Sequence, residues 1–471
     1  MTPSAAQLDE FRAVIGAGHV LTAPDDLAPY LREDRGRWRG AAGAVLRPAD
    51  TDEAARLVAI CAAGRIPLVP QGGNTGLVGG GMAEGGVVIS TGRMSRIRAL
   101  DALNATITVE AGATLLSVQE AARGAGLLFP LSLASEGSCQ IGGNLATNAG
   151  GTAVLRYGTM RDLTLGIEAV MPDGRVMDLL GGLRKDNTGY ALRDLLIGSE
   201  GTLGLITAAT LRLFPAPAQR ATAFIAAPGP HEALALFDLM RNRCGESLSA
   251  FEYLERFGLQ IVLDHLPGAR DPLAEPSPSY VLAELTSPDP ESDLSARFEA
   301  ALAEAFERGL ITDAAIGASE AQGAALWQLR EAMSEMQKHV GASIKHDVAV
   351  PVSRVADFIT EAVSACRAHM PGLRPCPFGH FGDGNIHFNL TRPEVMEDAE
   401  FLDHYPAFNR IVHDIVASMG GSISAEHGIG QAKRGELLRY KDPVALDLFR
   451  AVKAAIDPQG IMNPGKLIPP A

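Results

Sequence analysis

Two histidines and a glutamate in the C-terminal third of the chain have the residue types and spacing of a metal site. Residues 377–390 read PFGHFGDGNIHFNL, and Asp383-Gly384 within them is a strong signal for a two-residue hairpin turn. A type I′ turn at this dipeptide would place His380 directly opposite His387, with Cβ atoms roughly 4.5–5.5 Å apart. Both imidazoles could then reach one metal ion. The alternative is a loop in which hydrogen bonds satisfy both rings.

A second segment supplies a carboxylate and another imidazole. Residues 420–430 read GGSISAEHGIG, in which Glu426 and His427 are adjacent and flanked by small residues. Two histidines and one carboxylate are a common catalytic zinc set that leaves a coordination position open for water or substrate. The sequence therefore predicts His380, His387 and Glu426 as metal ligands and His427 as an acid/base group. The alternative for Glu426 and His427 is a solvated pair in a loop.

Three glycine-rich segments in the N-terminal half could hold a cofactor. Residues 70–81, PQGGNTGLVGGG, follow a short apolar stretch that we expect to be a strand. A strand that runs into such a loop presents bare backbone N–H groups, which bind phosphate. The loop has neither the Walker pattern nor a GxGxxG that opens a helix, and its alternative is a flexible surface loop. Residues 130–151 are rich in small, hydroxyl and amide side chains that could surround a flat polar ligand, and residues 198–207 are the third segment.

Composition and charge limit the classes of protein that fit this chain. Its 471 residues are too many for a single core, so we expect two or more domains. A hydrophobic content of 46% and a charged content of 20% are typical of a soluble globular protein. The formal net charge of −14 argues against nucleic acid or an anionic membrane surface as a partner. An anionic substrate would need a local cluster of cations.

Cysteine usage and the first residues bear on the location of the protein. The five cysteines are scattered and form no CxxC pair, which indicates a reducing compartment without a disulfide framework. Residues 1–16 show no basic region followed by an apolar core, and they carry acidic residues. This pattern predicts neither a secretory signal nor a mitochondrial transit peptide, and we find no apolar run long enough to span a bilayer. We therefore expect a cytoplasmic protein.

The expected elements change in character at Pro215–Pro217, where the glycine motifs stop. Before this point, a capped helix over residues 48–64 precedes several short strands. Beyond it, long helices alternate with short strands, for example a helix over 318–339 followed by a strand over 343–350. This alternation indicates an open sheet with helices on one face.

Taken together, the three glycine-rich segments, the histidine hairpin, AEHGIG and the closing NPGKL resemble a known family. The chain is similar, from about Pro48 to Leu467, to the FAD-linked 2-hydroxy-acid dehydrogenases of the vanillyl-alcohol-oxidase superfamily, and within them to the D-2-hydroxyglutarate dehydrogenases. The resemblance implies an α+β fold with three parts. These are a two-lobed FAD-binding domain over residues 1–217 with its core at about 40–217, an antiparallel-sheet cap domain over 218–425, and a C-terminal segment over 426–471 that packs on the FAD domain.

The resemblance also implies which residues contact the cofactors. The expected FAD contacts fall in the three glycine-rich segments and the closing motif: Gln71, Gly72, Gly73, Asn74, Thr75, Gly76, Leu77, Ser138, Gly142, Asn144, Thr147, Gly150, Glu200, Gly201, Ile206 and Asn463. Some relatives tether FAD through a histidine in the first loop, and this loop has none, so we expect non-covalent FAD. The family's zinc ligands map onto His380, His387 and Glu426, and another divalent ion would suit the same ligands.

Substrate contacts are expected in the segment that reads WQLREAMSEMQKHVGASIKHDVAVP. The resemblance implies that Arg330 and Lys345 bind a carboxylate, that Ser334 contributes a hydroxyl where relatives usually have threonine, and that Asn389 and His427 contact the reacting end. The spacing supports one pair, because Arg330 and Ser334 are four apart on a predicted helix and share a face. The planar guanidinium suits a carboxylate bidentately. The alternative is that the arginine and lysine form ordinary surface ion pairs.

The expected activity is FAD-dependent, metal-assisted oxidation of a D-2-hydroxy acid to the 2-oxo acid, with D-2-hydroxyglutarate or D-malate as substrate. The Cα hydride would pass to the flavin and the hydroxyl proton to His427, while the metal acts as a Lewis acid. Expected partners are the small-molecule substrate, an electron-transfer flavoprotein or quinone-linked acceptor, and a second copy in a homodimer. Two alternatives are a D-lactate or glycolate dehydrogenase flavin subunit, and a metal-dependent hydrolase without flavin.

Overall fold

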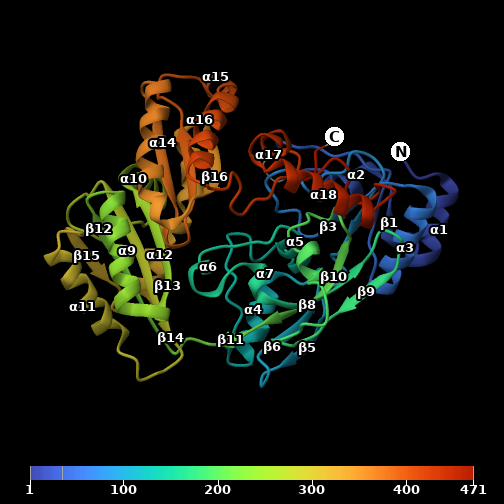
Figure 1. Ribbon diagram of the computed structural model, residues 1–471, viewed down its shortest axis with the longest axis horizontal. Coiled ribbons are helices and arrows are strands. Elements are labelled where there is room, and N and C mark those ends of the chain that lie inside the picture. Colours follow the sequence, from blue (N-terminus) through green and yellow to red (C-terminus); the bar gives the residue numbers. More distant parts are fainter. Residues whose placement is uncertain (1, 34–35, 470–471) are drawn as a thin grey trace. The chain divides into compact units, whose positions relative to one another are not determined.

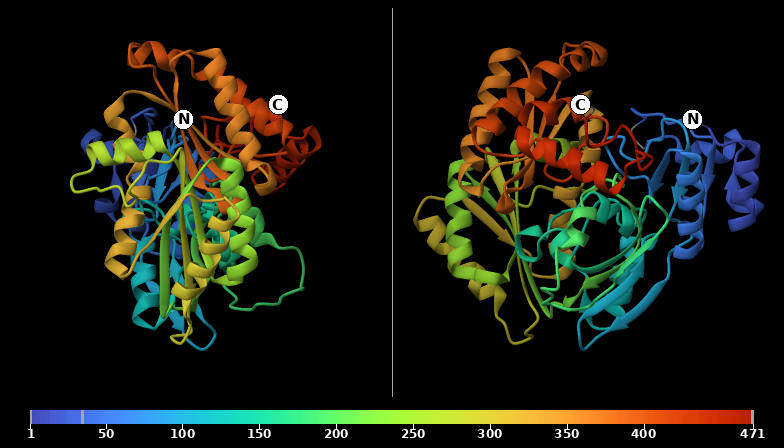
Figure 2. Two further views of the ribbon diagram at one scale, coloured as in Figure 1. Left: turned by 90° about the vertical axis from the view of Figure 1, so that its left-hand side faces the viewer. Right: turned by 45° about the vertical axis from the view of Figure 1, so that its right-hand side comes forward.

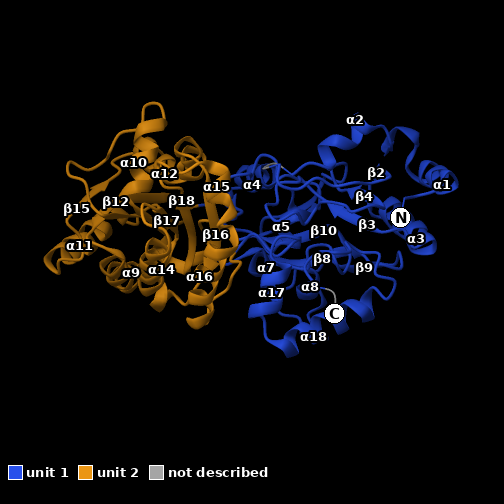
Figure 3. Ribbon diagram, turned by 90° about the horizontal axis from the view of Figure 1, so that it is seen from above, with its two compact units in different colours: residues 1–150, 157–216, 426–471 blue, residues 151–156, 217–425 orange. Residues whose placement is uncertain are grey.

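The structure is a computed structural model that describes residues 2–33 and 36–469 (Figure 1). It consists of two compact units, coloured separately in Figure 3. Unit 1 contains Met1–Gly150, Tyr157–Ala216 and Glu426–Ala471, and unit 2 contains Gly151–Arg156 and Pro217–Ala425. The sequence placed its boundaries after residues 217 and 425. The six-residue excursion of the chain at Gly151–Arg156 was not foreseen.

Unit 1 has two lobes, and a small sheet forms the core of the first. Its strand order is β1-β2-β4-β3, with β2–β4 and β4–β3 parallel. The strands are β1 (Val20–Leu21), β2 (Ala44–Leu46), β3 (Leu68–Gln71) and β4 (Val87–Ser90). The helices α1 (Ala5–Ile15) and α3 (Thr51–Gly64) pack their apolar residues on this sheet, and β3 leads directly into the first glycine-rich segment.

The second lobe of unit 1 is built on a five-stranded antiparallel sheet with the order β5-β6-β10-β8-β9. Its strands are β5 (Ile97–Asp101), β6 (Thr106–Glu110), β8 (Thr164–Val170), β9 (Val176–Leu179) and β10 (Leu205–Arg212). The helices α4 (Leu115–Gly124), α5 (Ile141–Ala146) and α7 (Met160–Leu163) share its hydrophobic core. The second glycine-rich segment contains α5, and the third leads into β10.

The C-terminal segment packs within unit 1. It contains α17 (Arg434–Tyr440) and α18 (Pro443–Ile456), shown in red in Figure 1. After α18 the chain lies along β3, where the Asn463 N–H donates to the Leu68 carbonyl at 2.8 Å. The Lys453 ammonium donates to the Thr202 carbonyl at 2.7 Å and so joins α18 to the third glycine-rich segment. These contacts join the C-terminal segment to the earlier part of unit 1.

Unit 2 is a seven-stranded sheet with the order β15-β12-β14-β13-β17-β18-β16, and its strand pairs are antiparallel. The strands are β12 (Gln219–Ala227), β13 (Leu248–Glu255), β14 (Ser279–Ser287), β15 (Asp313–Ile316), β16 (Ser343–Ala349), β17 (Arg374–His380) and β18 (Asn385–Thr391). Three strands at one edge, β17, β18 and β16, carry the candidate residues His380, His387, Asn389 and Lys345, whereas Arg330 and Ser334 belong to helices.

Helices cover both faces of this sheet, so the prediction of helices on one face was wrong (Figure 2). One face packs on α9 (Pro230–Cys244), α11 (Leu294–Glu307), α14 (Val355–His369) and α16 (Tyr405–Ser418), and the other on α10 (Arg256–His265), α12 (Glu320–Glu331) and α13 (Met333–Met336). Neighbouring residues show the alternation, since Phe224 belongs to the second core and Ile225 to the first. Of the helices in the described residues, none combines the length and apolar character needed to cross a membrane.

The hairpin between β17 and β18 differs from the predicted two-residue turn. A short 3-10 segment, Phe381–Asp383, connects the strands, and the register pairs Phe378 with His387, so His380 is not directly opposite His387. A type I′ turn needs positive φ at both central residues, but of the dipeptide Asp383-Gly384 only the glycine has it, with φ 84°. The aspartate side chain instead accepts the Asn385 N–H at 3.0 Å, which caps the longer turn.

Candidate active site

A cavity in unit 1 lies where the three glycine-rich segments meet. Most of the predicted FAD contacts line it: Gln71, Gly72, Gly73, Asn74, Thr75, Gly76, Gly142, Asn144, Thr147, Glu200, Gly201 and Ile206. Leu77, Ser138, Gly150 and Asn463 are not among its lining residues. The Asn463 amide nevertheless donates to the carbonyls of Gly80 at 3.0 Å and Glu200 at 2.7 Å, beside the cavity wall. The cavity also receives His427, the predicted acid/base group.

The glycines let the first loop approach the second segment closely while leaving backbone open to a ligand. A Cβ at Gly73 would stand 2.1 Å from the Ser138 carbonyl oxygen, so only glycine fits there. A Cβ at Gly76 or Gly143 would meet no other atom within 4 Å. The buried Oε1 atom of Gln71 and Oδ1 atom of Asn463 have no hydrogen-bond partner among the described residues. Exposed backbone and unpaired polar atoms suit a polar, phosphorylated cofactor such as FAD.

Glu200 ties the third glycine-rich segment to the loop that carries His427. Its carboxylate accepts the backbone N–H groups of Ile429 and Gly430, both at 2.7 Å. A Cβ at Gly428 would stand 2.8 Å from the same carboxylate, which explains the glycine next to His427. Burial raises the pKa of Glu200, and the two N–H donors oppose that shift without cancelling it. The Glu200 side chain therefore fixes the conformation of the loop that follows His427.

We expect Glu200→Gln to loosen this link. An amide oxygen can accept one N–H while the NH₂ group faces the other donor, and a buried unpaired donor costs about 1–3 kcal/mol. The melting temperature should fall and the FAD dissociation constant should rise, which thermal unfolding and a flavin-fluorescence titration measure. Glu120→Gln is the control, because Glu120 is an exposed carboxylate on α4 of the same unit. Equal values for the two variants would contradict the link.

Four adjacent strands of unit 2 direct the other candidate residues to one face of the sheet. The strand registers pair Glu252 with His380, Phe378 with His387, His387 with Asp347, and Asn389 with Lys345. Because side chains alternate along a strand, these pairs stand on the same side. The rings of His380 and His387 lie 5.4 Å apart between centroids, at an interplanar angle of 78°. The two imidazoles are therefore neighbours although the predicted register is absent.

A buried carboxylate, Glu252, supports His380. Its Oε1 atom lies 2.7 Å from the His380 Nδ1 atom, and its Oε2 atom accepts the Arg330 Nε–H at 2.7 Å. Burial would raise the pKa of Glu252, but the charges of His380 and Arg330 and the His380 hydrogen bond lower it to about 2. The glutamate is therefore an anion in the folded protein. A metal-binding histidine is usually oriented by such a carboxylate, which accepts the N–H of the ring nitrogen that does not bind the metal.

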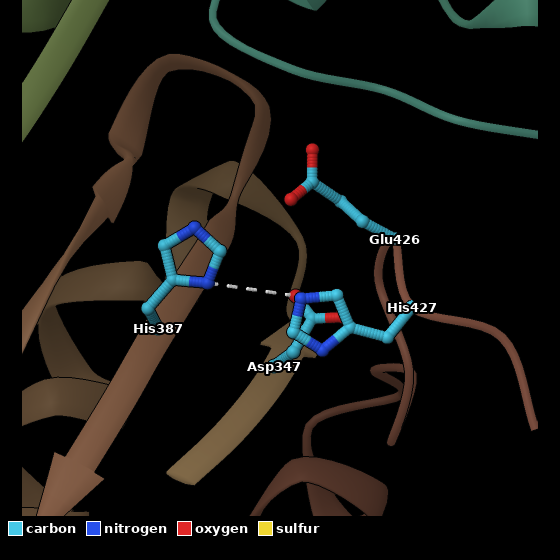
Figure 4. A group of neighbouring side chains, drawn as sticks. All are labelled: Asp347, His387, Glu426 and His427. Carbon is cyan, nitrogen blue, oxygen red and sulfur yellow. Dashed lines mark ion pairs between the residues drawn. The ribbon is translucent and has the colours of Figure 1, made fainter. Parts of the chain in front are cut away.

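A second carboxylate, Asp347, faces His387 (Figure 4). The Asp347 Oδ1 atom lies 3.8 Å from the His387 Nδ1 atom and accepts the Asn385 side-chain N–H at 3.0 Å. The Ala425 N–H donates to the Asp347 carbonyl at 3.3 Å, and Glu426 and His427 follow Ala425 directly in the chain. All four side chains drawn in Figure 4 carry atoms that can bind a divalent metal.

The candidate substrate residues differ in how much of them a ligand could use. Arg330 is buried, and both its Nε and Nη2 atoms lie 2.7 Å from Glu252 while its guanidinium stacks 4.9 Å from the Phe378 ring centre. The predicted continuous helix breaks between α12 and α13, so Ser334 belongs to a separate helix and is exposed. The Asn389 amide donates to the Gln337 side chain at 2.8 Å. Lys345 lies beside it on β16, at the directly opposed position.

The sequence reasoning missed Glu252 and Asp347, although both leave a signal. Glu252 is an acidic residue within LSAFEYLE, a stretch whose apolar character predicts a buried strand. Asp347 lies two residues after Lys345, on the same side of a strand, in SIKHDVA. A charged residue at a buried strand position needs a partner, so each of these positions indicates a buried pair, although the sequence does not say which residue the partner is.

Comparison with known proteins places these features in a family context. The "FAD binding domain" model matches residues 42–180 and the "FAD linked oxidases, C-terminal domain" model matches residues 216–467. The chain is 38% identical over 456 residues to "D-2-hydroxyglutarate dehydrogenase, mitochondrial" of Bos taurus, covering 96% of this chain and 81% of the relative. It is 37% identical over 447 residues to D-2-hydroxyglutarate dehydrogenase of Xanthomonas citri pv. viticola, covering 95% and 93%.

A solved structure of p-cresol methylhydroxylase with substrate bound is similar to the whole chain in fold. The TM-score is 0.77 at 17% identity, over 98% of this chain and 96% of that chain. At this identity the likeness concerns the fold alone. It confirms the predicted class, an α+β protein with a two-lobed FAD-binding part and an antiparallel sheet in the other part.

Proposed function

Because this chain belongs to the FAD-linked oxidases and, within them, to the D-2-hydroxyglutarate dehydrogenase family, we propose that it oxidises D-2-hydroxyglutarate to the 2-oxo acid, and D-malate as a second substrate. It is an FAD-linked oxidoreductase, so the alternative of a metal hydrolase without flavin is not supported. One observation carries the choice of substrate. A single sheet face in unit 2 holds two histidines backed by carboxylates beside Lys345 and Arg330, in a chain of net charge −14.

We propose that His380, His387 and Glu426 hold Zn²⁺ or another divalent ion. Each histidine turns its Nδ1 atom toward a carboxylate, Glu252 or Asp347, so the Nε2 atoms would be the ligand atoms. Glu426 directly follows Ala425, whose N–H donates to the Asp347 carbonyl on β16, and Glu426 would be the third metal ligand. A bound divalent ion supplies Lewis acidity that lowers the pKa of the substrate's α-hydroxyl.

The remaining roles follow from the chain's own side chains. His427 lines the cofactor cavity and would accept the hydroxyl proton as general base. Lys345 would bind the far carboxylate of the substrate, and Arg330 would add only its outer edge because its Nε and Nη2 atoms serve Glu252. Asn389 would contact the reacting end, and Ser334 would add a hydroxyl. The three glycine-rich segments would hold FAD without a covalent bond, and the bound flavin would supply hydride acceptance.

A substrate panel tests this proposal. The protein, reconstituted with FAD and Zn²⁺, should show flavin absorption bands that bleach when D-2-hydroxyglutarate is added without an acceptor. With an artificial acceptor, kcat/KM should exceed that for D-lactate by about 10²-fold or more, because lactate has no far carboxylate for Lys345 to bind. If D-lactate were the best substrate, the result would favour the D-lactate dehydrogenase alternative. If glycolate were the best substrate, it would favour the glycolate dehydrogenase flavin subunit. The electron-transfer flavoprotein or quinone-linked acceptor, the homodimer and the cytoplasmic location stay predictions.

A further inference from the structure

Glu252 is shared between two candidate residues that serve different parts of the reaction. It lies in the middle of β13 and is fully buried. Its Oε1 atom is bonded to the His380 Nδ1 atom at 2.7 Å, and its Oε2 atom accepts from the Arg330 guanidinium at 2.7 Å. His380 belongs to the proposed metal centre, and Arg330 to the proposed binding of the far carboxylate.

We propose that Glu252 is a positioning residue that fixes the tautomer of His380 for metal binding and the orientation of Arg330 for the dicarboxylate. This inference rests on the proposed metal centre and substrate. Glu252 itself would touch neither the metal nor the substrate. It acts through the two side chains that it holds.

The effect on His380 follows from the two ring nitrogens. A carboxylate accepts a hydrogen bond from a nitrogen that carries a hydrogen. Glu252 therefore keeps the hydrogen of His380 on Nδ1 and the lone pair on Nε2. Direct pairing of Glu252 with His380 in the β13–β17 register fixes the distance between their backbones. The histidine is therefore oriented before a metal arrives. Partners of this kind typically change metal affinity by about 10–100-fold when they are removed.

The effect on Arg330 follows from its planar shape. Two of its nitrogens, Nε and Nη2, face the same carboxylate oxygen, and the Phe378 ring supports its plane at 4.9 Å. A guanidinium held on one edge and one face keeps a single orientation. Arg330 is also buried, and a buried cation without an anionic partner is strongly unfavourable. Glu252 therefore keeps this cation in place.

A neighbouring glutamate offers a matched comparison. Glu284, on β14 next to β13, is also buried and accepts from the Arg220 guanidinium at 2.6 Å and from the Trp327 indole N–H at 2.8 Å. Neither partner is a candidate metal ligand or substrate contact. Substitution of Glu284 therefore reports what the loss of a buried, ion-paired carboxylate in this sheet does by itself.

The test compares Glu252→Gln, Glu284→Gln and wild type in the full-length protein. The zinc dissociation constant of the metal-free protein is measured by competition with a chromogenic chelator, and folding is checked by circular dichroism. In Glu252→Gln, the His380 Nδ1–H and the Arg330 guanidinium compete for a single amide oxygen. We therefore expect zinc affinity to fall about 10-fold or more, as it typically does when the carboxylate partner of a metal-binding histidine is removed. Glu284→Gln should bind zinc as wild type does. Equal zinc affinity in the two variants would overturn the role of Glu252.

A double variant, Glu252→Gln with Arg330→Met, separates positioning from general damage. Without the arginine, the amide oxygen is available to accept the His380 Nδ1–H, and the buried charge that would disrupt folding is gone. We expect zinc affinity to return toward the wild-type value while KM for D-2-hydroxyglutarate rises and that for D-lactate does not. A double variant that binds zinc as weakly as the single variant would overturn the proposal. A wild-type protein that binds no zinc would instead refute the proposed metal centre, and with it this role.

Discussion

Removal of the metal is expected to lower kcat/KM for D-2-hydroxyglutarate by about 10³-fold or more while flavin stays bound. A Lewis-acidic cation contributes several kcal/mol to the stabilisation of a developing alkoxide, and each 1.4 kcal/mol is about tenfold in rate. The cavity proposed for FAD is lined by residues of unit 1 and contains neither His380 nor His387. Dialysis against a chelator followed by activity and absorption measurements checks both halves of this expectation.

Two variants give this prediction its controls. Activity of the wild-type protein should return when Zn²⁺ is added back, whereas His387→Ala should stay inactive in the same titration. His231→Ala removes an exposed histidine on α9 and should behave as wild type throughout. If chelation and His387→Ala both left turnover unchanged, the two histidines would have a structural role, and the alternative of rings satisfied by hydrogen bonds would hold.

Local chemistry made the cofactor segments predictable. The glycine and small residues of each segment indicate a backbone that is open to a ligand. In the structure, all three segments line one cavity. The hairpin was less predictable, because Asp383-Gly384 is compatible with more than one turn. The side chain of Asp383 bonds to the Asn385 N–H, and this contact selected a longer connection that shifts the register. A dipeptide signal fixes the existence of a turn better than it fixes which residues face each other.

Long-range topology explains what the sequence did not reveal. The order β13-β17-β18 brings Glu252 to His380 across 128 positions of sequence, and no local pattern encodes that neighbourhood. The same topology buries both faces of the central strands, as in β14, whose residues Ser279–Ser287 are buried throughout. A strand buried on both faces shows no polar–apolar alternation. The expectation of helices on one face came instead from the order of helices and strands along the chain, which does not say which face each helix covers.

Replacement of His427 is expected to have the second largest effect. We expect His427→Gln to lower kcat by about 10²–10⁴-fold, the usual contribution of a positioned general base. The side chain lines the cofactor cavity at the end of the segment that Glu200 holds through Ile429 and Gly430. Because glutamine keeps the size and polarity of the side chain, KM and FAD affinity should change little. Steady-state kinetics and a flavin titration measure these three quantities.

The pH profile distinguishes a base from a structural side chain. A general base must be deprotonated to act, so wild-type kcat/KM should fall toward acidic pH, and this limb should disappear in His427→Gln. His231→Gln, the control at an exposed site, should keep the wild-type profile. A variant that loses flavin together with activity would assign His427 to the cofactor cavity alone. Activity within tenfold of wild type, with the acidic limb intact, would place the proton acceptor on another side chain, and Asp347 beside His387 would be the next to replace.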